Sequence, residues 1–256
     1  MRILVTGLSG FIGSSLGPHL AARGHEVRRD GMEGCEAVVH LANIAHARAD
    51  RAALWKVNVE GTAAIARQAA GAGVRRFLYL SSAKAREPDD LYGEAKLAAE
   101  QSLLQLPGVE VVIIRPPLVY GPRVRANFLA LMNAIARGWP LPFASIKNRR
   151  SFVYVGNLCD AIAACLQVPA AAGKTFYVAD GPAISTPELC RAIGRVLGRP
   201  ARLFPFPPAL LPSERLTGSL EVDDSGLRAD LGWRPRFTLE EGLRATADWY
   251  RSRSSA

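Results

Sequence analysis

The first half of the chain alternates short apolar runs with longer stretches in which apolar residues recur every three or four positions. Short continuous runs are typical of buried strands, and the longer spacing is typical of amphipathic helices. Because strands that alternate with helices form parallel sheets, the pattern predicts an α/β fold with a Rossmann-type, doubly wound parallel sheet. The expected strands are 3–5, 25–30, 37–43, 76–81 and 110–115, and the expected helices are 13–23, 51–72 and 92–106.

The regular alternation stops near residue 120, and short strands then mix with helices and proline-rich connections. We therefore expect a first domain over 1–120, with a return near 151–168, and the glycine-rich turn described next identifies it as a dinucleotide-binding domain. A smaller mixed α/β C-terminal substrate-binding cap is expected over 121–256, interleaved with the first domain. Its expected helices are 127–137, 157–167, 186–197 and 239–253, and the short strands of this half are 152–154 and 175–178.

A glycine-rich turn, Thr6-Gly-x-x-Gly-x-x-Gly13, joins the first expected strand to the first expected helix. A strand, a glycine turn and a helix in this order are typical of dinucleotide binding. Gly7 permits the tight turn, Gly10 lets a pyrophosphate approach the backbone, and Gly13 lets the helix pack closely on the strand. We expect the cofactor to contact the turn through Gly7, Ser9, Gly10, Phe11, Ile12 and Gly13.

The end of the second expected strand bears on the choice of cofactor. In this fold an acidic residue there binds the ribose 2′-hydroxyl of NAD, and an arginine binds the 2′-phosphate of NADP. The chain offers Arg28 and Arg29 together with Asp30. The pattern therefore predicts NAD or NADP and leaves both choices open.

A third feature is the stretch from Ser81 to Lys96, in which Tyr92 and Lys96 are four residues apart on an expected helix. Residues at this spacing share one helix face, so the ammonium group can lie near the phenol. A nearby cation favours the phenolate and lowers the pKa of a tyrosine from about 10. With Ser82 holding a substrate oxygen, this set would suit proton transfer in alcohol and ketone chemistry.

The composition narrows the range of partners. The formal net charge is +9, but the basic residues are scattered and no block of five or six Lys or Arg occurs. We expect an anionic ligand that carries phosphates, and no nucleic acid, because an aromatic–basic motif is absent. The four cysteines have no metal-ligand spacing, no apolar run reaches the ~20 residues of a membrane span, and no secretory segment opens the chain, so we expect no metal and a cytoplasmic protein.

Taken together, the motifs resemble the extended short-chain dehydrogenase/reductase family, in its NAD-dependent epimerase/dehydratase branch that acts on nucleotide-diphosphate sugars. The resemblance extends over nearly the whole chain and is carried by the order of the motifs. They are the glycine turn, His40-Leu-Ala, Asn58-x-x-Gly-Thr62, Ser81-Ser82, Tyr92-x-x-x-Lys96, Arg115-Pro-x-x-Val-Tyr-Gly-Pro122, Arg150-Ser-Phe-Val-Tyr-Val155 and Leu231-Gly-Trp-Arg-Pro235.

The resemblance implies a role for each matching residue. Tyr92 would be the acid and base on the sugar oxygen, Lys96 would lower its pKa and hold the nicotinamide ribose, and Ser82 would bind the reacting oxygen. Asn58 would belong to a supporting catalytic network, and Arg150 would bind the sugar-nucleotide diphosphate. Further cofactor contacts implied are Leu41, Ala42, Asn43, Ser81 and Pro116, and further substrate contacts are Pro117, Asn127, Phe128 and Arg215.

The chain departs from the family pattern in three places. The segment before Ala37 is short, so a strand and the usual adenine contacts are expected to be missing. The segment between Ser82 and Tyr92 is also trimmed. Family dehydratases place an Asp-Glu pair after the serine, whereas Ala83 and Lys84 stand here. The resemblance therefore argues against dehydration.

Three functions follow from these patterns. We place first an epimerase that transfers a hydride at sugar C4, similar to UDP-glucose 4-epimerase, with a UDP-sugar as the preferred substrate. The alternative is an NAD(P)H-dependent 4-keto-sugar nucleotide reductase in polysaccharide or O-antigen sugar synthesis, and a non-catalytic cofactor sensor or scaffold is an alternative of another class. A homodimer through the helices 51–72 and 92–106 would fit the family.

Overall fold

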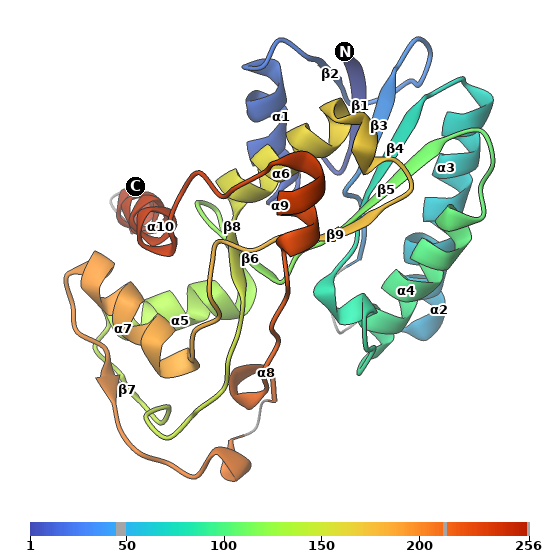
Figure 1. Cartoon of the computed structure of the whole chain (residues 1–256). Coiled ribbons are helices and arrows are strands. Elements are labelled where there is room, and N and C mark those ends of the chain that lie inside the picture. Colours follow the sequence, from blue (N-terminus) through green and yellow to red (C-terminus); the bar gives the residue numbers. More distant parts are fainter. Residues whose placement is uncertain (45–49, 212–213, 255–256) are drawn as a thin grey trace. The chain divides into compact units, whose positions relative to one another are not determined.

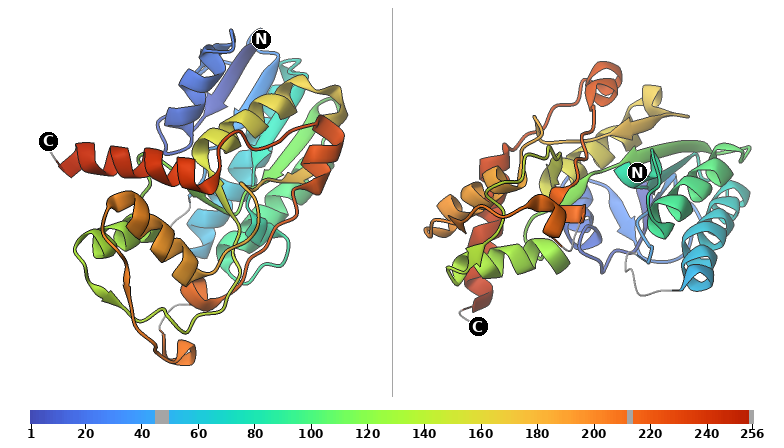
Figure 2. Two further views of the ribbon diagram at one scale, coloured as in Figure 1. Left: turned by 60° about the vertical axis from the view of Figure 1, so that its left-hand side comes forward. Right: turned by 90° about the horizontal axis from the view of Figure 1, so that it is seen from below.

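The computed structural model describes residues 1–44, 50–211 and 214–254, and the side chains of 214, 215 and 254 lie outside this description. The chain divides into two compact units, each built from several segments (Figures 1 and 2). Unit 1 comprises Met1–Pro116, Leu158–Val178 and Asp223–Arg234, and unit 2 comprises Pro117–Asn157, Ala179–Val222 and Pro235–Ala256.

Unit 1 is built on a parallel sheet of six strands in the order β2-β1-β3-β4-β5-β9. Every neighbouring pair of this sheet is parallel, as strands separated by helical crossovers must be. The strand β2 forms an edge, and the described residues place no strand outside it, in agreement with the short connection before Ala37. The strands are β1 (Arg2–Thr6), β2 (Glu26–Arg28), β3 (Ala37–His40), β4 (Arg76–Leu80), β5 (Glu110–Arg115) and β9 (Thr175–Tyr177).

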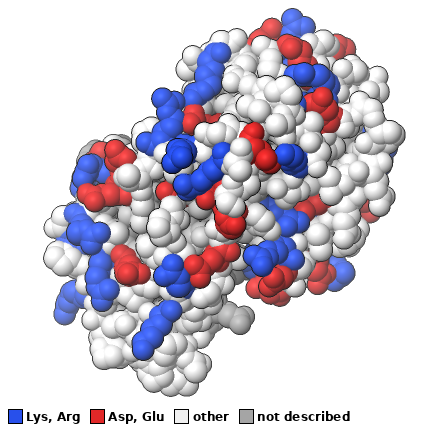
Figure 3. Space-filling view, viewed as in Figure 1, with Lys and Arg blue, Asp and Glu red and all other residues white. Residues whose placement is uncertain are grey.

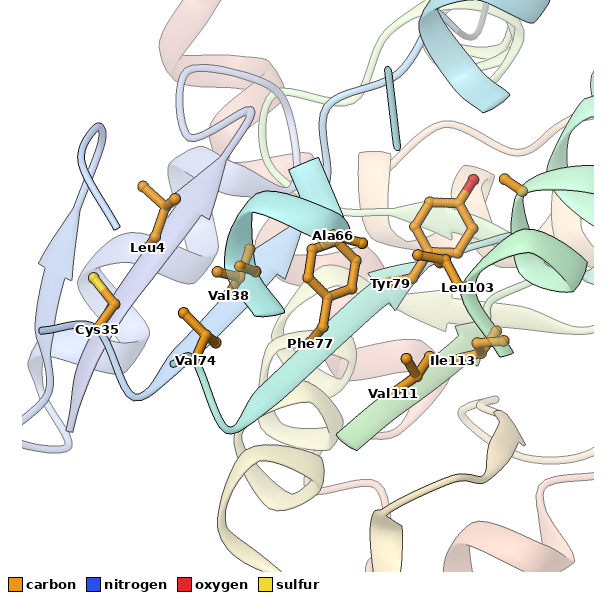
Figure 4. Packing of buried hydrophobic residues seen from close by; sticks show 12 residues of the cluster. Leu4, Cys35, Val38, Ala66, Val74, Phe77, Tyr79, Leu103, Val111 and Ile113 are labelled. Carbon is orange, nitrogen blue, oxygen red and sulfur yellow. The ribbon is translucent and has the colours of Figure 1, made fainter. Parts of the chain in front are cut away.

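One face of this sheet packs against α3 (Thr62–Gly71) and α4 (Leu91–Leu104). The alternate strand residues Phe77 and Tyr79 lie in one cluster with Ala66 of α3 (Figure 4). Ala99 of α4 belongs to the same buried cluster. Because alanine adds little bulk, the helix backbones approach the sheet closely. This packing fixes the start of α4, which carries Tyr92, against the end of β4.

The opposite face is covered by α1 (Gly13–Ala21) and by the unit 1 part of α6 (Val155–Gln167) (Figure 1). The side chain of Arg76 is buried on this face and donates to the carbonyl oxygens of Cys165, Leu166 and Val168 at 2.7–3.1 Å. The carbonyls of Cys165 and Leu166 belong to the last turn of α6, so the guanidinium caps the end of this helix. The remaining helices of unit 1 are α2 (Arg51–Trp55), α9 (Ser225–Leu231) and the 3₁₀ turns Ala83–Ala85 and Pro169–Ala171.

The helix expected over 51–72 is present but not uniform. A π-helical stretch, Lys56–Gly61, separates α2 from α3. Such stretches are rare and cluster at functional sites. Asn58, a residue that helix propensity disfavours, lies within this stretch and is fully buried.

Unit 2 contains two short strand pairs and four helices in the part of the chain that the structure describes. Asp180 accepts hydrogen bonds from the hydroxyl of Tyr120, the backbone N–H of Tyr154 and the side chain of Asn157 at 2.7–2.9 Å. This carboxylate ties together the strand pair β6–β8 and the start of α6. The elements are β6 (Leu118–Tyr120), β8 (Phe152–Tyr154), β7 (Pro140–Leu141), β10 (Arg202–Leu203), α5 (Ala126–Ala136), α7 (Thr186–Leu197), α8 (Glu214–Thr217), α10 (Leu239–Ser254) and the 3₁₀ turn Pro208–Leu210.

The surface and the cysteines add two observations. Lys and Arg side chains are interspersed with Asp and Glu side chains on the face drawn in Figure 3. All four cysteines are buried and unpaired. Among the described helices, none combines the length and the apolar character that a membrane crossing needs.

Candidate active site

The glycine turn after β1 is packed so closely that side chains are excluded. Gly7 has a φ of 74°, and a Cβ there would lie 2.9 Å from the backbone nitrogen of Ala42. A Cβ on Gly13 would come closer than 3.0 Å to the carbonyl oxygen of Gly7, which also accepts the N–H of Gly10 at 3.0 Å. The turn leads bare backbone into α1, whose first N–H groups can bind phosphate oxygens. The other predicted contacts of the turn are Ser9, which is exposed, and Phe11 and Ile12, which are half-buried.

A line of polar groups joins the ends of β1 and β3 to the π-helical stretch. The hydroxyl of Thr62 donates to the carbonyl of Asn58 at 2.8 Å, so its oxygen accepts from Nε2 of His40 at 3.1 Å. Nδ1 of His40 then accepts from the hydroxyl of Thr6 at 2.7 Å, and the Thr6 oxygen accepts the N–H of Ala42 at 3.3 Å. Burial, with Lys96 second, lowers the pKa of His40 to about 4. His40 is therefore neutral at working pH, as this bonding requires.

Asn58 is a clamp on the loop after β3. Its Oδ1 accepts the N–H of Ile44 at 2.8 Å, and its Nδ2 donates to the carbonyl of Ile44 at 2.9 Å. Both ends of the amide are thus used by one residue of that loop. Asn43 donates to the carbonyl of Leu41 at 3.0 Å, which further fixes the three predicted cofactor contacts Leu41, Ala42 and Asn43.

The two serines after β4 have different environments. Ser81 is buried, and its hydroxyl donates to the carboxylate of Glu100. Ser82 is half-buried, and its hydroxyl oxygen accepts the N–H of Lys84 at 3.3 Å as it caps the 3₁₀ turn. Because its hydroxyl acts there as an acceptor, the Ser82 hydrogen can donate to a substrate oxygen.

Lys96 is fully buried beneath the end of β4. Its ammonium group donates to the carbonyl of Leu80 at 2.8 Å and lies 4.6 Å from the ring centroid of Tyr79. Burial lowers the pKa of Lys96 to about 7, and Glu100 counteracts part of this effect. The charge on Lys96 therefore changes within the working range of pH.

Tyr92 is half-buried in the first turn of α4, and the ammonium group of Lys96 lies 5.8 Å from its ring centroid. The pair expected from the four-residue spacing is thus brought together. The direction of the pKa differs from the expectation, because burial, followed by the charge of Asp90, raises the pKa of Tyr92 to about 12. The desolvation of the phenol outweighs the effect of the nearby amine, which is itself only partly charged near neutral pH.

A buried ion pair next to this set was not predicted from the sequence. Glu100 is 2% exposed and accepts from the guanidinium of Arg115 through both carboxylate oxygens. Arg115 also donates to the hydroxyl of Tyr177 at 2.8 Å. The available signal was position, since Glu100 is four residues after Lys96 and therefore shares its helix face.

The end of β2 presents the three residues that bear on cofactor choice. Arg28 is half-buried, and its Nη1 donates to the carbonyl of Glu33 at 3.2 Å. Arg29 and Asp30 are exposed. The short connection to β3 thus uses the side chain of Arg28 to hold itself together.

In unit 2, Arg150 is half-buried between segments that its backbone joins. Its N–H donates to Ile184 at 2.8 Å, and its Nη1 donates to the carbonyl of Gly218 at 2.8 Å. No carboxylate of the described residues forms an ion pair with it, and burial lowers its pKa. Four of its five guanidinium N–H groups have no protein acceptor in the part of the chain described here, which leaves a fork that suits an anion.

The other predicted substrate contacts of unit 2 differ in accessibility. Asn127 is exposed in the first turn of α5, whereas Phe128 is 5% exposed and stacks on Tyr120 with centroids 5.6 Å apart. Phe128 therefore fills the interior of unit 2. Pro117 is buried, and Arg215 lies in α8 with its side chain outside the described residues. In unit 1, the carbonyl of Pro116 accepts the N–H of Ala83 at 2.9 Å.

A parallel sheet with a glycine turn after its first strand, and with a serine, a tyrosine and a lysine around the end of another strand, defines a dinucleotide-binding oxidoreductase. The model of the NAD dependent epimerase/dehydratase family matches residues 30–179. A UDP-glucose 4-epimerase of Vibrio cholerae is 36% identical, and the match covers 96% of this chain and 94% of that protein. The chain therefore belongs to the NAD dependent epimerase/dehydratase family.

Other relatives show how widely the fold is used. A ceramide reductase of Caulobacter vibrioides is 27% identical over 98% of this chain and 94% of that protein. The structure of RMD from Pseudomonas aeruginosa complexed with NADPH superposes with a TM-score of 0.83 at 25% identity and covers 98% of this chain and 99% of that one. The family, the fold class and the nicotinamide cofactor predicted from the sequence are confirmed.

Proposed function

We propose that this enzyme is a nicotinamide-dependent epimerase of nucleotide-diphosphate sugars, with hydride transfer at sugar C4 and a UDP-sugar as substrate. The observation that carries the proposal is the grouping of Ser82, Tyr92 and Lys96 around the end of β4, in a chain 36% identical to a UDP-glucose 4-epimerase. Ser82 and Tyr92 are half-buried, so both can meet a ligand.

The glycine turn fits a dinucleotide, because a Cβ at Gly7 or Gly13 would collide with backbone and only bare main chain can form this turn. We assign the pyrophosphate to the N–H groups at the start of α1. A bound nicotinamide would supply the acceptor and donor of the hydride at the sugar carbon. Unit 1 is in this account the dinucleotide-binding unit, and unit 2 the substrate-binding unit.

The proton chemistry falls to three side chains. Tyr92 removes the proton of the C4 hydroxyl as the carbon is oxidised, and gives it back when the ketone is reduced. Lys96, in its charged form, stabilises the phenolate form of Tyr92 that takes up this proton. Ser82 donates its hydroxyl hydrogen to the same sugar oxygen, which orients that oxygen toward Tyr92.

Arg150 is the proposed ligand of the substrate diphosphate. Its guanidinium is half-buried, bonds only the carbonyl of Gly218 in the described residues, and has no ion-pair partner there. A buried cation without a carboxylate costs free energy unless an anion is bound, so the diphosphate would satisfy it. Asn127 in the exposed first turn of α5 is the second polar group that we assign to the nucleotide, and Arg215 remains a further proposed diphosphate ligand.

A second candidate is reduction of a 4-keto-sugar nucleotide with exchangeable NADPH. It is favoured by the short connection after β2, which removes contacts on the adenine side, and by the exposed guanidinium of Arg29 at the strand end. An arginine in this position suits the 2′-phosphate of NADP. The two candidates differ in whether oxidised cofactor leaves the enzyme after each turnover.

We also propose a homodimer in the reducing cytoplasm. Val57, Leu91 and Leu104 are 42%, 40% and 53% exposed on the α2–α3 segment and on α4, and exposed apolar residues of this size mark contact surfaces. Light scattering would give the mass of a dimer, and a monomer mass at all concentrations would exclude it. The four free, buried cysteines fit a reducing compartment.

The test uses the purified enzyme, NAD(H) or NADP(H), and a panel of UDP-sugars and 4-keto sugars. We expect epimerisation by the wild type, and a loss of about 10²-fold or more in Tyr92→Phe with dinucleotide binding unchanged. Tyr250→Phe, which removes the hydroxyl that donates to Asn133 in unit 2, is the matched control. Inactivity on every sugar, with no thermal shift from any dinucleotide, would refute the enzyme; a thermal shift without turnover would favour a sensor.

A further inference from the structure

The turn between Ser82 and Tyr92 is organised by Lys84, to which neither the family resemblance nor the proposed mechanism gives a role. The backbone N–H of Lys84 donates to the hydroxyl oxygen of Ser82 at 3.3 Å. Its ammonium group donates to Asp89 at 2.9 Å and to Asp90 at 2.7 Å. One residue is therefore bonded both to the serine of the site and to the carboxylate two residues before the tyrosine.

Asp90 is the N-cap of α4. Its Oδ1 accepts the N–H of Gly93 at 2.8 Å, while its Oδ2 accepts from Lys84. A Cβ on Gly93 would lie 2.8 Å from the carbonyl oxygen of Lys84, so the turn and the first helical turn are in backbone contact. Tyr92 lies between the cap and this contact. The contacts among Lys84, Asp90 and Gly93 therefore fix the position of Tyr92.

The contact between Lys84 and Asp90 also affects the charge near the phenol of Tyr92. Asp90 is the carboxylate that raises the pKa of Tyr92, second only to burial. The ammonium group of Lys84 sits on that carboxylate and offsets its charge. Two further groups interact with Tyr92 directly, namely Lys96 on the same helix and Tyr79 on β4. Glu100 on α4 interacts with both Lys96 and Tyr79, and His40 on β3 interacts with Lys96.

We propose that Lys84 is a positioning residue of the active site, which orients the Ser82 hydroxyl through its backbone and neutralises the Asp90 carboxylate beside Tyr92 through its side chain. The proposal rests on the proposed function for its effect on turnover. Its effect on Tyr92 itself can be measured without turnover.

The variants separate charge from structure. Asn caps helices as well as Asp, so Asp90→Asn removes the charge and keeps the cap. Lys84→Met removes the ammonium group that bonds Asp90 and keeps the Asp90 carboxylate. Lys84→Met/Asp90→Asn removes both charges, and Lys84→Arg restores the cation. Asp89→Asn is the matched control, because Asp89 binds the same ammonium group but is not among the groups that act on Tyr92.

Two measurements read the result. The first follows the ¹³Cζ signal of labelled Tyr92, assigned with Tyr92→Phe, between about pH 8 and 13 with NAD present, because burial raises the pKa of Tyr92 to about 12. We expect its titration to move to higher pH in Lys84→Met and to lower pH in Asp90→Asn. The double variant should follow Asp90→Asn, and Asp89→Asn and Lys84→Arg should follow the wild type.

The second is kcat at neutral pH, which we expect to fall about three- to tenfold in Lys84→Met and to recover in the double variant. If Lys84 holds the turn in place without an electrostatic effect on Tyr92, the pattern is different. Lys84→Met and the double variant would then be equally slow, the melting temperature would fall in both, and the Tyr92 signal would titrate as in the wild type. That pattern would overturn the proposal. If no sugar is turned over by the wild type, the proposed function fails, and the Tyr92 titration alone decides for or against Lys84.

Discussion

The buried carboxylate of Glu100 favours the charged form of Lys96, and replacing it tests this effect. It is 2% exposed, it is paired with Arg115, and it is the acidic group that raises the pKa of Lys96 against the effect of burial. Glu100→Gln keeps the volume and the hydrogen-bond acceptor for Arg115 but removes the negative charge. We therefore expect the pKa of Lys96, about 7 in the wild type, to fall further.

The sign of the pH effect follows from which form of Lys96 acts. Activity needs the charged amine, so it declines as pH rises through the pKa of Lys96, and this decline should begin at lower pH in Glu100→Gln. Each lowering of that pKa by 1 corresponds to about 1.4 kcal/mol and about tenfold less charged lysine above it. Breaking the pair with Arg115, which is 15% exposed, adds a stability cost of about 1–3 kcal/mol.

The linked effect on folding has the opposite sign. Because the pKa of Lys96 is lower in the folded protein than in the unfolded chain, the unfolded chain binds more protons between about pH 7 and 10.5. The buried lysine therefore costs stability that is regained as pH rises through this window. In Glu100→Gln the window should extend to lower pH.

The assay is kcat against pH, together with the melting temperature at each pH. Glu110→Gln is the matched control, since Glu110 pairs with the buried Arg76 in a similar way but does not act on Lys96. A variant Glu100→Gln that loses stability while keeping the wild-type alkaline decline of kcat would refute this reasoning.

Three further substitutions test other parts of the site. Gly13→Ala should abolish the thermal shift caused by dinucleotides, since its Cβ would overlap the carbonyl of Gly7, whereas Gly71→Ala has open space and should keep the shift. Arg150→Ala should raise KM for the UDP-sugar about tenfold or more with little change in kcat, and the exposed Arg149→Ala should not; equal effects would reject the diphosphate assignment. Asn58→Ala leaves the part-buried N–H and carbonyl of Ile44 without the Asn58 side chain and should cost about 2–4 kcal/mol in urea unfolding, and a loss below about 0.5 kcal/mol would show that these two hydrogen bonds are dispensable.

Much of the fold could be predicted from the sequence, because the signals were local and strong. The strand expected over 110–115 is β5, and the helix expected over 186–197 is α7, which begins with a capping box at Ser185. The edge position of β2 also followed from the short connection before Ala37. These features depend on residues close together in the chain.

Features that depend on distant partners could not be predicted. The π-helical stretch contains Asn58, whose side chain binds the backbone of Ile44. The hydrophobic periodicity of the sequence gives no sign of such a contact. The two serines after β4 look equivalent in sequence, yet Ser81 is occupied by Glu100 from the far end of α4. Phe128, which was predicted to contact the nucleotide, stacks on Tyr120 within unit 2, a contact between distant residues that the sequence does not indicate.

The pKa of Tyr92 shows the same limit in another way. The spacing to Lys96 predicted a lowered pKa, because a sequence shows which charges are near but not how far they are removed from water. Burial of both groups reverses the direction, lowering the pKa of Lys96 and raising that of Tyr92. The direction was wrong for a physical reason that the structure supplies.

In the proposed epimerase mechanism, a hydride leaves sugar C4 and returns to the same carbon. This mechanism is tested most directly by incubating the enzyme and its dinucleotide with UDP-glucose deuterated at C4, and recording the product by NMR. We expect UDP-galactose that keeps deuterium at C4, in water and with no build-up of free reduced cofactor, and no product with Tyr92→Phe. Loss of deuterium to the solvent would contradict hydride transfer, and a 4-keto product with free reduced cofactor would contradict epimerisation.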